Sequence, residues 1–462
     1  MSGPQQSWCY LLPSPPQPAP PQPQFPPPSP PPSILYTSPD GTVALIDIPT
    51  SISSTAPLNL LSVAPPTTPY ILPEPKDPTV IFNQELQDLH HLCRGNIIHA
   101  LNTAHRDHPG PWHLPRHKSD LKSTTTAFSS LTQAFKSNLH LLQPTSQEPL
   151  NVTDLGQDEA LEITDIYNCI VQNPSASYTH LPIAVSNESS HPKNRSTFLI
   201  PPHSAFLLSP FQTSLPTFTT YAQRIGLFNF ILLDPPWPNR SAERSRLTTY
   251  DVLPNPQDLL RIPIETSLRE NALVAVWVTN KPRWRAFVLK ELFPQWGVEP
   301  AGEWRWLKIT DKGEPIFDLD SVMRKPYESL LFGRKKARRK LVPKGYKRRR
   351  GNGGEQFDAR EREERGVPGK VILGVPDLHS RKPCLRGEEY PHPCPIEISG
   401  EGGQIEVRAH IRLRLEVADL VRPLLPADYT ACEIFGRCLV EGWLTWGDDA
   451  IRYNAPEYCG DG

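Results

Sequence analysis

The 462-residue chain lacks several features that would point to common protein classes. It has no run of eighteen apolar residues, so a membrane-spanning helix is not expected. Residues 1–33 contain no Arg or Lys and no basic stretch before an apolar one, which argues against a secretory or mitochondrial leader. The 48 Lys and Arg balance 49 Asp and Glu, so net charge alone does not indicate a nucleic-acid-binding protein. The eight cysteines include no Cys-x-x-Cys pair, which argues against structural zinc and favours a reducing intracellular compartment.

Proline, by contrast, is abundant, and 14 of the 56 prolines fall within the first 32 residues. Such a segment forms extended polyproline II structure and buries little surface, which predicts a disordered tail over residues 1–33. The tail is interpreted either as a solvated spacer or as a ligand for an SH3- or WW-type partner. A second, short tail is expected at 457–462.

Residues 34–195 are expected to form a separate, partly helical N-terminal module. Two strands are predicted around the turn Pro39-Asp40-Gly41. Apolar residues at helical spacing predict helices over residues 81–101, 128–142 and 158–171. His90, His91 and Cys93 lie on the first of these helices, but adjacent histidines do not share a helix face, so no metal site is expected.

From residue 196 to 456, apolar runs alternate with helical patterns, which predicts an α/β domain with a mostly parallel sheet. The expected strands and helices lie at Phe228–Leu233, Ala272–Val278, Arg283–Phe293, Glu303–Ile309, Glu328–Phe332, Lys370–Val375 and Ala431–Phe435. Two stretches, 334–369 and 386–416, interrupt this pattern and are interpreted as surface insertions. The second has an alternative explanation, an intron that was not removed from the gene model.

The most informative tetrapeptide is Asp234-Pro235-Pro236-Trp237, which follows the apolar strand FNFILL directly. Ligands of open α/β sheets bind at the carboxyl ends of strands. An exocyclic amine such as N6 of adenine is a poor nucleophile, because its lone pair is conjugated with the ring. The Asp234 carboxylate and the Pro235 carbonyl would hold the amino hydrogens, while the two prolines stiffen the backbone. Trp237 would offer an aromatic face to an extruded base. The alternative interpretation is a strand-ending turn with a surface tryptophan.

Several further segments follow in a fixed order: DPPWPNRSAERSRLTTY, LVAVWVTN, GVEPAGEWRWLKITDKGEPIF, RKPYESLLFGR, VPDLHSRKP and EIFGRCLVEGWLTWG. In this order the chain resembles the N6-adenine methyltransferase (MT-A70-like) family over about 196–383 and 417–456. The resemblance implies a Rossmann-like methyltransferase fold that uses S-adenosylmethionine. No glycine-rich loop precedes DPPW, and the segment that resembles the donor-binding strand follows it, which is the permuted motif order of this family.

The resemblance also implies which residues bind the methyl donor. Lys382 matches a basic residue near the donor and the target adenine, and Phe435 and Arg437 match the strand that holds the donor. Gly447-Asp448-Asp449 replaces the Gly-Asn-Glu or Gly-Asn-Gln of relatives, and Ser209-Pro210 stands where relatives often carry an acidic residue. The expected donor-binding residues are therefore Ser209, Asp234, Lys382, Phe435, Arg437, Gly447, Asp448 and Asp449.

On the substrate side, the resemblance places Glu303 and Lys325 beside the pocket, and Asn239 and Arg240 are expected to face the sugar or phosphate of the nucleotide. Trp277, Trp304 and Trp306 are expected to pack in the core as the simplest interpretation. The basic stretch Lys335–Arg350 holds ten Lys and Arg in sixteen positions and indicates nuclear import, contact with RNA phosphates, or both.

These expectations together describe an intracellular, monomeric N6-adenine methyltransferase that needs no metal. By resemblance, its substrate is an adenosine in small nuclear RNA, including one that already carries a 2′-O-methyl group. Adenine in DNA is the alternative substrate, and a catalytically weak RNA-binding scaffold of the same fold is the alternative function. A third interpretation makes the proline-rich tail an interaction hub. The nucleus is the expected location, with the cytoplasm and the mitochondrion as alternatives.

Overall fold

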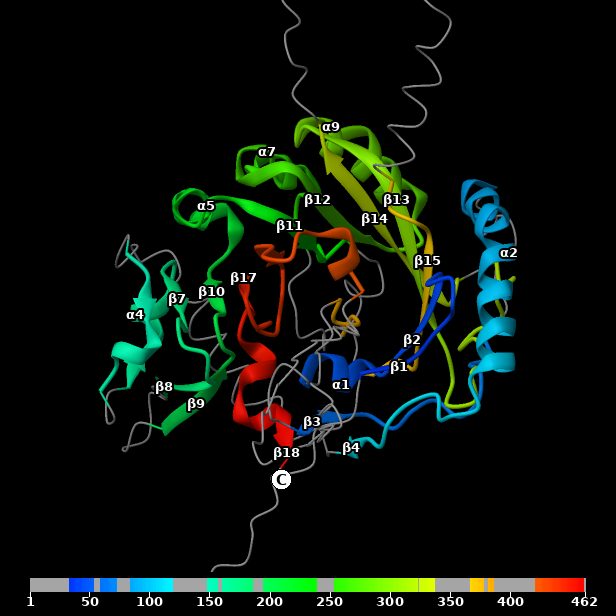
Figure 1. Ribbon diagram of the computed structural model, residues 1–462, viewed down its shortest axis with the longest axis horizontal. Helices are drawn as coiled ribbons and strands as arrows, with labels where there is room; N and C mark the ends of the chain where they lie inside the picture. The colour runs from blue at the N-terminus through cyan, green and yellow to red at the C-terminus, as the bar shows by residue number, and fades with distance from the viewer. Residues whose placement is uncertain are drawn as a thin grey trace, which may run out of the picture. The chain divides into compact units, whose positions relative to one another are not determined.

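A mixed sheet of twelve strands organises the structure (Figure 1). In spatial order the strands are β1 (Ile34–Thr37), β2 (Val43–Ile46), β15 (Lys370–Gly374), β13 (Val298–Lys308), β14 (Tyr327–Lys335), β12 (Leu268–Val278), β11 (Phe228–Leu233), β16 (Ala431–Ile434), β17 (Trp443–Gly447), β10 (Ala205–Leu208), β7 (Ile170–Gln172) and β5 (Leu150–Asn151). The computed structural model describes residues 33–53, 59–72, 84–118, 148–156, 160–185, 194–238, 253–322, 324–336, 366–377, 381–385 and 420–460. No helix within these ranges is long and apolar enough to cross a membrane.

The centre of the sheet is parallel: β12, β11, β16, β17 and β10 run in the same direction. Antiparallel pairs join β14 to both β12 and β13, β1 to β2, and β7 to β10. Every residue of β11 is buried, as expected of a strand covered on both faces whose sequence FNFILL is apolar except for Asn229. Because parallel strands end at the same edge, the residues after β11, β16, β17 and β10 meet there.

The helices divide between the two faces of the sheet. The even-numbered valines of β12 are buried on one face of the sheet. The elements that cover them there are α5 (Phe211–Arg224), α7 (Ile264–Ser267), α8 (Pro282–Phe287), a π-helical turn (Val288–Leu292) and α9 (Phe293–Gln295). The long helix α2 (Gln84–Asp107) packs against β2 and β15, and Figure 1 shows it beside that end of the sheet. On the other face, Trp277, Trp304 and Trp306 lead a large apolar cluster that also includes Ile48 and Ile52 of α1 (Ile48–Ser53).

The expected separation of residues 34–195 from the rest of the chain is not what the structure shows. The predicted hairpin forms. The Ser38 and Thr42 hydroxyls donate to the Asp40 carboxylate, and Gly41 has a φ of +70°. Its strand β2 then pairs in parallel with β15, while β5 and β7 lengthen the opposite end of the same sheet. Residues 34–195 therefore supply both ends of the central sheet.

Local differences from the expected elements are few. The predicted helix over 158–171 is replaced by β6 (Leu161–Glu162), the single turn α4 (Ile163–Ile166) and β7, whereas the helix expected over 128–142 lies outside the described residues. Two small sheets flank the main one, β6 with β8 (Thr179–Val185) and β9 (Asn194–Ile200), and β18 (Cys459–Gly460) with β3 (Asn59–Ser62) and β4 (His117–Lys118). Short 3₁₀ turns lie at Val152–Asp154, Pro256–Arg261, Arg422–Leu424, Arg452–Asn454 and Pro456–Tyr458.

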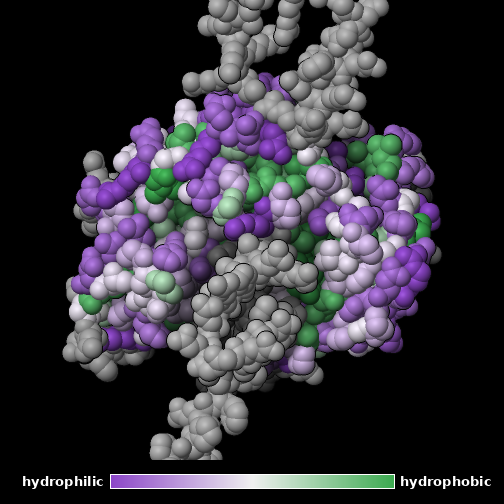
Figure 2. Space-filling model, in the orientation of Figure 1, coloured by the Kyte–Doolittle hydropathy of each residue, from purple (hydrophilic) through white to green (hydrophobic). Residues whose placement is uncertain are grey.

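The boundaries of the interruptions also differ. Strand β14 continues through Lys335, past the expected start of the first insertion at 334, and the chain is bonded to the sheet again at Val367, whose N–H donates to the Ala301 carbonyl at 2.7 Å. Cys459 and Gly460 pair with β3, so the expected tail from 457 is in part a strand. The tail of residues 1–32 and the second insertion, 386–416, lie outside the described residues. Figure 2 shows hydrophilic side chains over most of the described surface on the viewed face.

Candidate active site

The Asp-Pro-Pro-Trp turn begins one residue after β11 ends. The Asp234 N–H donates to the Ile434 carbonyl at the end of β16 (3.3 Å), so the turn is bonded to the neighbouring parallel strand. The Trp237 N–H donates to the Pro235 carbonyl (2.8 Å), and the Leu253 N–H donates to the Pro236 carbonyl (2.9 Å). These bonds fix the turn at the carboxyl edge of the sheet, where ligands of such folds bind.

The sequence predicted that Trp237 presents an open aromatic face, and the structure shows that it does not. Its side chain is only 6% exposed, and its Nε1–H donates to the Trp277 carbonyl (2.8 Å). Trp284 of α8 stacks on it with ring centroids 5.0 Å apart and planes 23° apart. The contacts of Trp237 therefore hold the turn against α8, and one face of the indole is already covered.

Asp234 and Lys382 form the ion pair at the centre of the site. The Lys382 Nζ lies 3.0 and 3.1 Å from the two Asp234 carboxylate oxygens and 3.3 Å from a Glu328 oxygen, and Glu328 in turn accepts from Lys308 at 2.5 Å. Burial alone would lower the pKa of Lys382, but Asp234 and Glu328 outweigh it and raise that pKa. Burial likewise opposes ionisation of Glu328, yet Lys308 and Lys382 lower its pKa to about 2. The four groups thus alternate in sign, and each charge is compensated by a neighbour.

A buried network anchors the loop that carries Lys382. The Arg381 guanidinium donates to the Asp377 carboxylate (2.6 Å) and the Leu61 carbonyl (2.8 Å) and lies 4.3 Å from the centroid of the Tyr453 ring. Arg116 lies 3.8 Å from both Asp377 and Asp47. All four charged side chains are at most 2% exposed. Sequence reasoning missed this network, because its members lie as far apart as residues 47 and 381.

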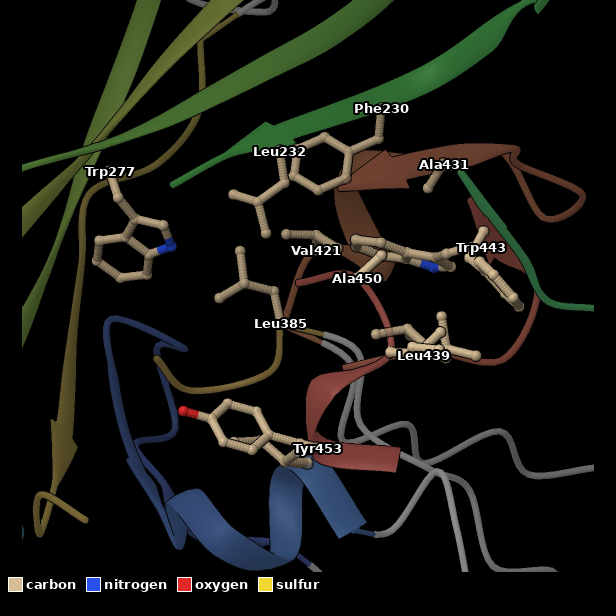
Figure 3. Close-up of a cluster of buried hydrophobic side chains, with 14 of the residues drawn as sticks. Phe230, Leu232, Trp277, Leu385, Val421, Ala431, Leu439, Trp443, Ala450 and Tyr453 are labelled. Atoms are coloured by element: carbon tan, nitrogen blue, oxygen red, sulfur yellow. The ribbon is translucent and has the colours of Figure 1, made fainter. Parts of the chain in front are cut away.

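The Asp234 cavity, of about 640 Å³, opens beside this ion pair on the face of the sheet that carries Trp277. Figure 3 shows Trp277, Leu232 and Leu385 around a common space, with Tyr453 below. The cavity has apolar walls and three lining cations, Arg381, Lys382 and Arg437, beside the carboxyl groups of Asp234 and Glu433. Burial and the nearby Asp234 charge raise the pKa of Glu433 to about 7. Sequence reasoning also missed Glu433, although it directly precedes Ile434 and Phe435 in the motif that identified the strand.

A second cavity, the Gly447 cavity of about 420 Å³, lies on the opposite face at the ends of β16 and β17. Its walls include Phe211, Phe435, Trp446, Gly447 and Asp448, and Pro236 of the Asp-Pro-Pro-Trp turn also lines it. Phe435 has a φ of +68°, and its N–H donates to the Trp446 carbonyl (2.6 Å).

Most of the predicted donor-binding residues therefore surround these two cavities. Ser209 is buried at the end of β10, where its N–H donates to the Gly447 carbonyl (3.4 Å) and its hydroxyl contacts Thr213 (3.1 Å). Asp449 is bonded to Arg452 (3.2 Å), which turns its carboxylate toward the protein.

The predicted substrate-side residues are more dispersed. Glu303 lies between Arg285 (2.8 Å) and Arg305 (3.1 Å) and lines a third cavity. Lys325 is 5% exposed and donates to Gln87 of α2 (3.3 Å), away from the residues that line the Asp234 cavity. Asn239, Arg240 and residues 337–350 of the basic stretch lie outside the described residues. His90 is engaged by Tyr327 and Asp320, and no group of three metal-binding side chains occurs within the described ranges.

The comparison with known proteins agrees with this geometry. Residues 228–388, which contain Asp234 and Lys382, match the family profile MT-A70. The chain is a methyltransferase with an MT-A70 domain over these residues. The relatives of this MT-A70 chain include a Pyricularia oryzae protein named N6-methyladenosine RNA methyltransferase MTA1, 29% identical over 91% of this chain and 94% of that protein. The human N(6)-adenine-specific methyltransferase METTL4 (methyltransferase-like protein 4) is 28% identical over 71% of this chain and 57% of its own length. A Caenorhabditis elegans protein named DNA N6-methyl methyltransferase is 36% identical over 30% of the chain.

Proposed function

We propose that this MT-A70 protein transfers a methyl group from S-adenosylmethionine to N6 of adenine in nucleic acid. The observation that carries the proposal is Asp234, held by Lys382 at the strand edge between two cavities. A carboxylate there accepts the hydrogens of an amino group and favours the pyramidal nitrogen that transfer requires. The Pro235 carbonyl already accepts from Trp237, and its second lone pair is a further acceptor beside Asp234. Positioning of the amine therefore falls mainly to the protein.

The lining of the two cavities fits S-adenosylmethionine. The methionyl end of that molecule is zwitterionic, and the Asp234 cavity has Lys382 and Arg437 for a carboxylate and Asp234 and Glu433 for an ammonium group. The Gly447 cavity has the aromatic walls that suit a purine, and Asp448 is an acceptor for ribose hydroxyls. When bound, the cofactor supplies an electrophilic methyl group on a sulfonium.

RNA is the substrate class that we propose, and a small nuclear RNA adenosine with or without a 2′-O-methyl group is the finer form of the proposal. The names of the Pyricularia oryzae and human relatives support adenine N6 methylation, and the former names RNA. DNA is the alternative, which the name of the Caenorhabditis elegans relative favours. We further propose a monomer in the nucleus, with residues 335–350 as the import signal and residues 1–33 as the segment that an SH3- or WW-type partner would bind. Imaging of a tagged chain without 335–350 tests the first point, and pulldown with the tail peptide tests the second.

The deciding experiment is a methylation assay with the full chain, labelled S-adenosylmethionine and three matched oligonucleotides. These carry one adenosine, one 2′-O-methyladenosine or one deoxyadenosine in the same sequence. Label at N6 in either ribo-oligonucleotide, lost in Asp234→Ala, supports RNA methylation, and preference for the second supports the finer proposal. Label only in the deoxy-oligonucleotide would replace RNA by DNA. Binding of S-adenosylhomocysteine without any transfer would favour an RNA-binding scaffold instead.

A further inference from the structure

A third cavity, which we call the Lys281 cavity, lies between α2 and the ends of β12, β13 and β14. It measures about 350 Å³. Leu86 and Leu89 of α2 form an apolar wall, and the opposite wall is polar and charged; its residues include Thr279, Lys281, Arg285, Glu303, Arg305 and Ser329. The mixture of an apolar wall with convergent polar groups is that of a small-ligand site.

The charge of this cavity is not balanced. Glu303 is bonded to Arg285 (2.8 Å) and Arg305 (3.1 Å), and Lys281 is a third cation in the lining. Among the described lining residues two arginines thus share one carboxylate, so the arginines alone carry one positive charge in excess. Thr279 Oγ1 and Arg305 Nε are buried hydrogen-bonding atoms without a partner among the described residues. Buried polar atoms are nearly always bonded, so two such atoms beside an excess of cations indicate an anionic ligand.

The Lys281 cavity adjoins the catalytic turn but is separate from the Asp234 cavity. The Lys281 Nζ donates to the Pro238 carbonyl (3.2 Å), directly after Trp237. On β14, Tyr327 and Ser329 line the Lys281 cavity, while Glu328 between them points the other way, to Lys382. Because alternate residues of a strand face opposite sides, the two cavities lie on opposite faces of β14. An adenine held at Asp234 therefore leaves the Lys281 cavity open for a neighbouring group of the same ligand.

We propose that the Lys281 cavity binds the nucleotide next to the target adenosine. Its phosphate would lie against Lys281, Arg285 and Arg305, and its sugar or base would lie against Leu86 and Leu89 of α2. At the exposed rim, the Arg283 guanidinium stacks on Trp284 (4.2 Å), which itself stacks on Trp237, so a polar and aromatic surface continues from the catalytic turn past the cavity. This inference rests on the proposed function, because a flanking nucleotide exists only in a nucleic-acid substrate.

The test uses the full chain and a nine-nucleotide RNA with one central adenosine, in which single phosphates are replaced in turn by uncharged methylphosphonates. Arg285→Ala removes a cation of the cavity, and Leu86→Trp fills its apolar side without a change in charge. We expect each variant to weaken binding of the unmodified RNA about tenfold, and Arg285→Ala to reduce the salt dependence by about one phosphate contact. Arg285→Ala should have no effect on the RNA whose critical flanking phosphate is already neutral. Arg269→Ala, at the opposite end of β12, is the matched control, and its RNA affinity should stay within twofold of the wild type.

Calorimetric titration with S-adenosylhomocysteine separates a binding role from a structural one. Unchanged affinity for this molecule in both variants, with the pattern above, supports the inference. Equal losses on every methylphosphonate RNA, no loss at all, or a parallel loss of S-adenosylhomocysteine binding would overturn it. The proposed function fails separately: if the wild type shows the binding pattern but methylates no oligonucleotide, the nucleotide site stands and the methylation proposal does not.

Discussion

The Asp234 cavity and the Lys281 cavity lie on opposite faces of one strand, and they treat charge differently. In the first, Lys382 and Arg437 lie beside the carboxyl groups of Asp234 and Glu433, and the third lining cation, Arg381, is paired with Asp377. In the second, Arg285 and Arg305 share Glu303 as their partner, and Lys281 is a third cation of the described lining. A balanced site suits a zwitterion, whereas a site with excess positive charge suits an anion. Under our proposals, the methionyl end of the methyl donor would lie on one face of β14 and a flanking nucleotide of the substrate on the other.

The largest effect is expected when the negative charge of Asp234 is removed from the Asp234 cavity. Asp234→Asn keeps the size of the side chain but leaves Lys382 without its carboxylate partner. We expect the methylation rate to fall about a thousandfold, or roughly 4 kcal/mol of transition-state stabilisation. Single-turnover kinetics would measure this. Circular dichroism should show an unchanged fold, and a rate within tenfold of the wild type would contradict the role of Asp234.

Arg381 and Lys382 are adjacent in the sequence, yet their contacts give them different roles. Arg381 is buried with Asp377 and supports the loop, so Arg381→Ala leaves the Asp377 carboxylate with the Val63 N–H (3.0 Å) and the more distant Arg116 (3.8 Å). We expect this change to lower the unfolding free energy by about 4 kcal/mol, because it removes one partner of a buried ion pair. Urea denaturation would measure it. Lys382→Met serves as the contrast, with a loss of activity larger than its loss of stability.

Glu433 makes the stability of the balanced site depend on pH. Its pKa is raised from 4.5 to about 7, chiefly by burial. Between these values the unfolded chain has lost the proton of Glu433 while the folded protein keeps it, so stability falls as pH rises to about 7 and levels off above that value. Glu433→Gln should reduce the difference in unfolding free energy between pH 5 and pH 8 by about 2.5 kcal/mol, measured by urea denaturation without the methyl donor. A wild type and variant with parallel pH profiles would refute this.

The smallest effect is expected at Arg283, on the exposed rim of the Lys281 cavity. Arg283→Ala removes one cation that stacks on Trp284 and does not line either cavity. RNA affinity should fall about threefold, in the range of one exposed cation–aromatic contact, and Arg283→Lys should recover part of it. Fluorescence anisotropy at two salt concentrations would measure the change. An effect as large as that of Arg285→Ala would remove the distinction between the rim and the Lys281 cavity.

The sequence was most informative where the signal is local. The strand FNFILL, the turn that follows it and the hairpin at Asp40 were predictable because each depends on a few consecutive residues. The pairing of β2 with β15, which are more than 300 residues apart, has no such local signal. For that reason the sequence predicted a separate N-terminal module, whereas the structure places β2 in the central sheet. The same applies to the ion pairs of Arg116 with Asp47 and Asp377, which are distant from it in the sequence.

Side-chain roles were harder to predict than positions. Asp234 and Lys382 were found from their motifs, and the structure brings them within 3.1 Å of each other. Trp237 was found as well, but the stacking of Trp284 on its ring depends on where α8 packs, which the motif does not encode. Lys325 was assigned to the substrate pocket, whereas the packing of α2 buries it against Gln87.

One hydrogen bond bears on how this gene can be read. The Leu420 N–H donates to the Leu385 carbonyl at 3.1 Å, so the residue described before 386–419 and the residue described after them lie side by side. Joining these two positions directly would leave β15, the Lys382 loop and β16 in their places. Transcripts that include or omit the codons for 386–419 in frame would therefore both encode these described elements, and this junction is a natural position for a reporter domain.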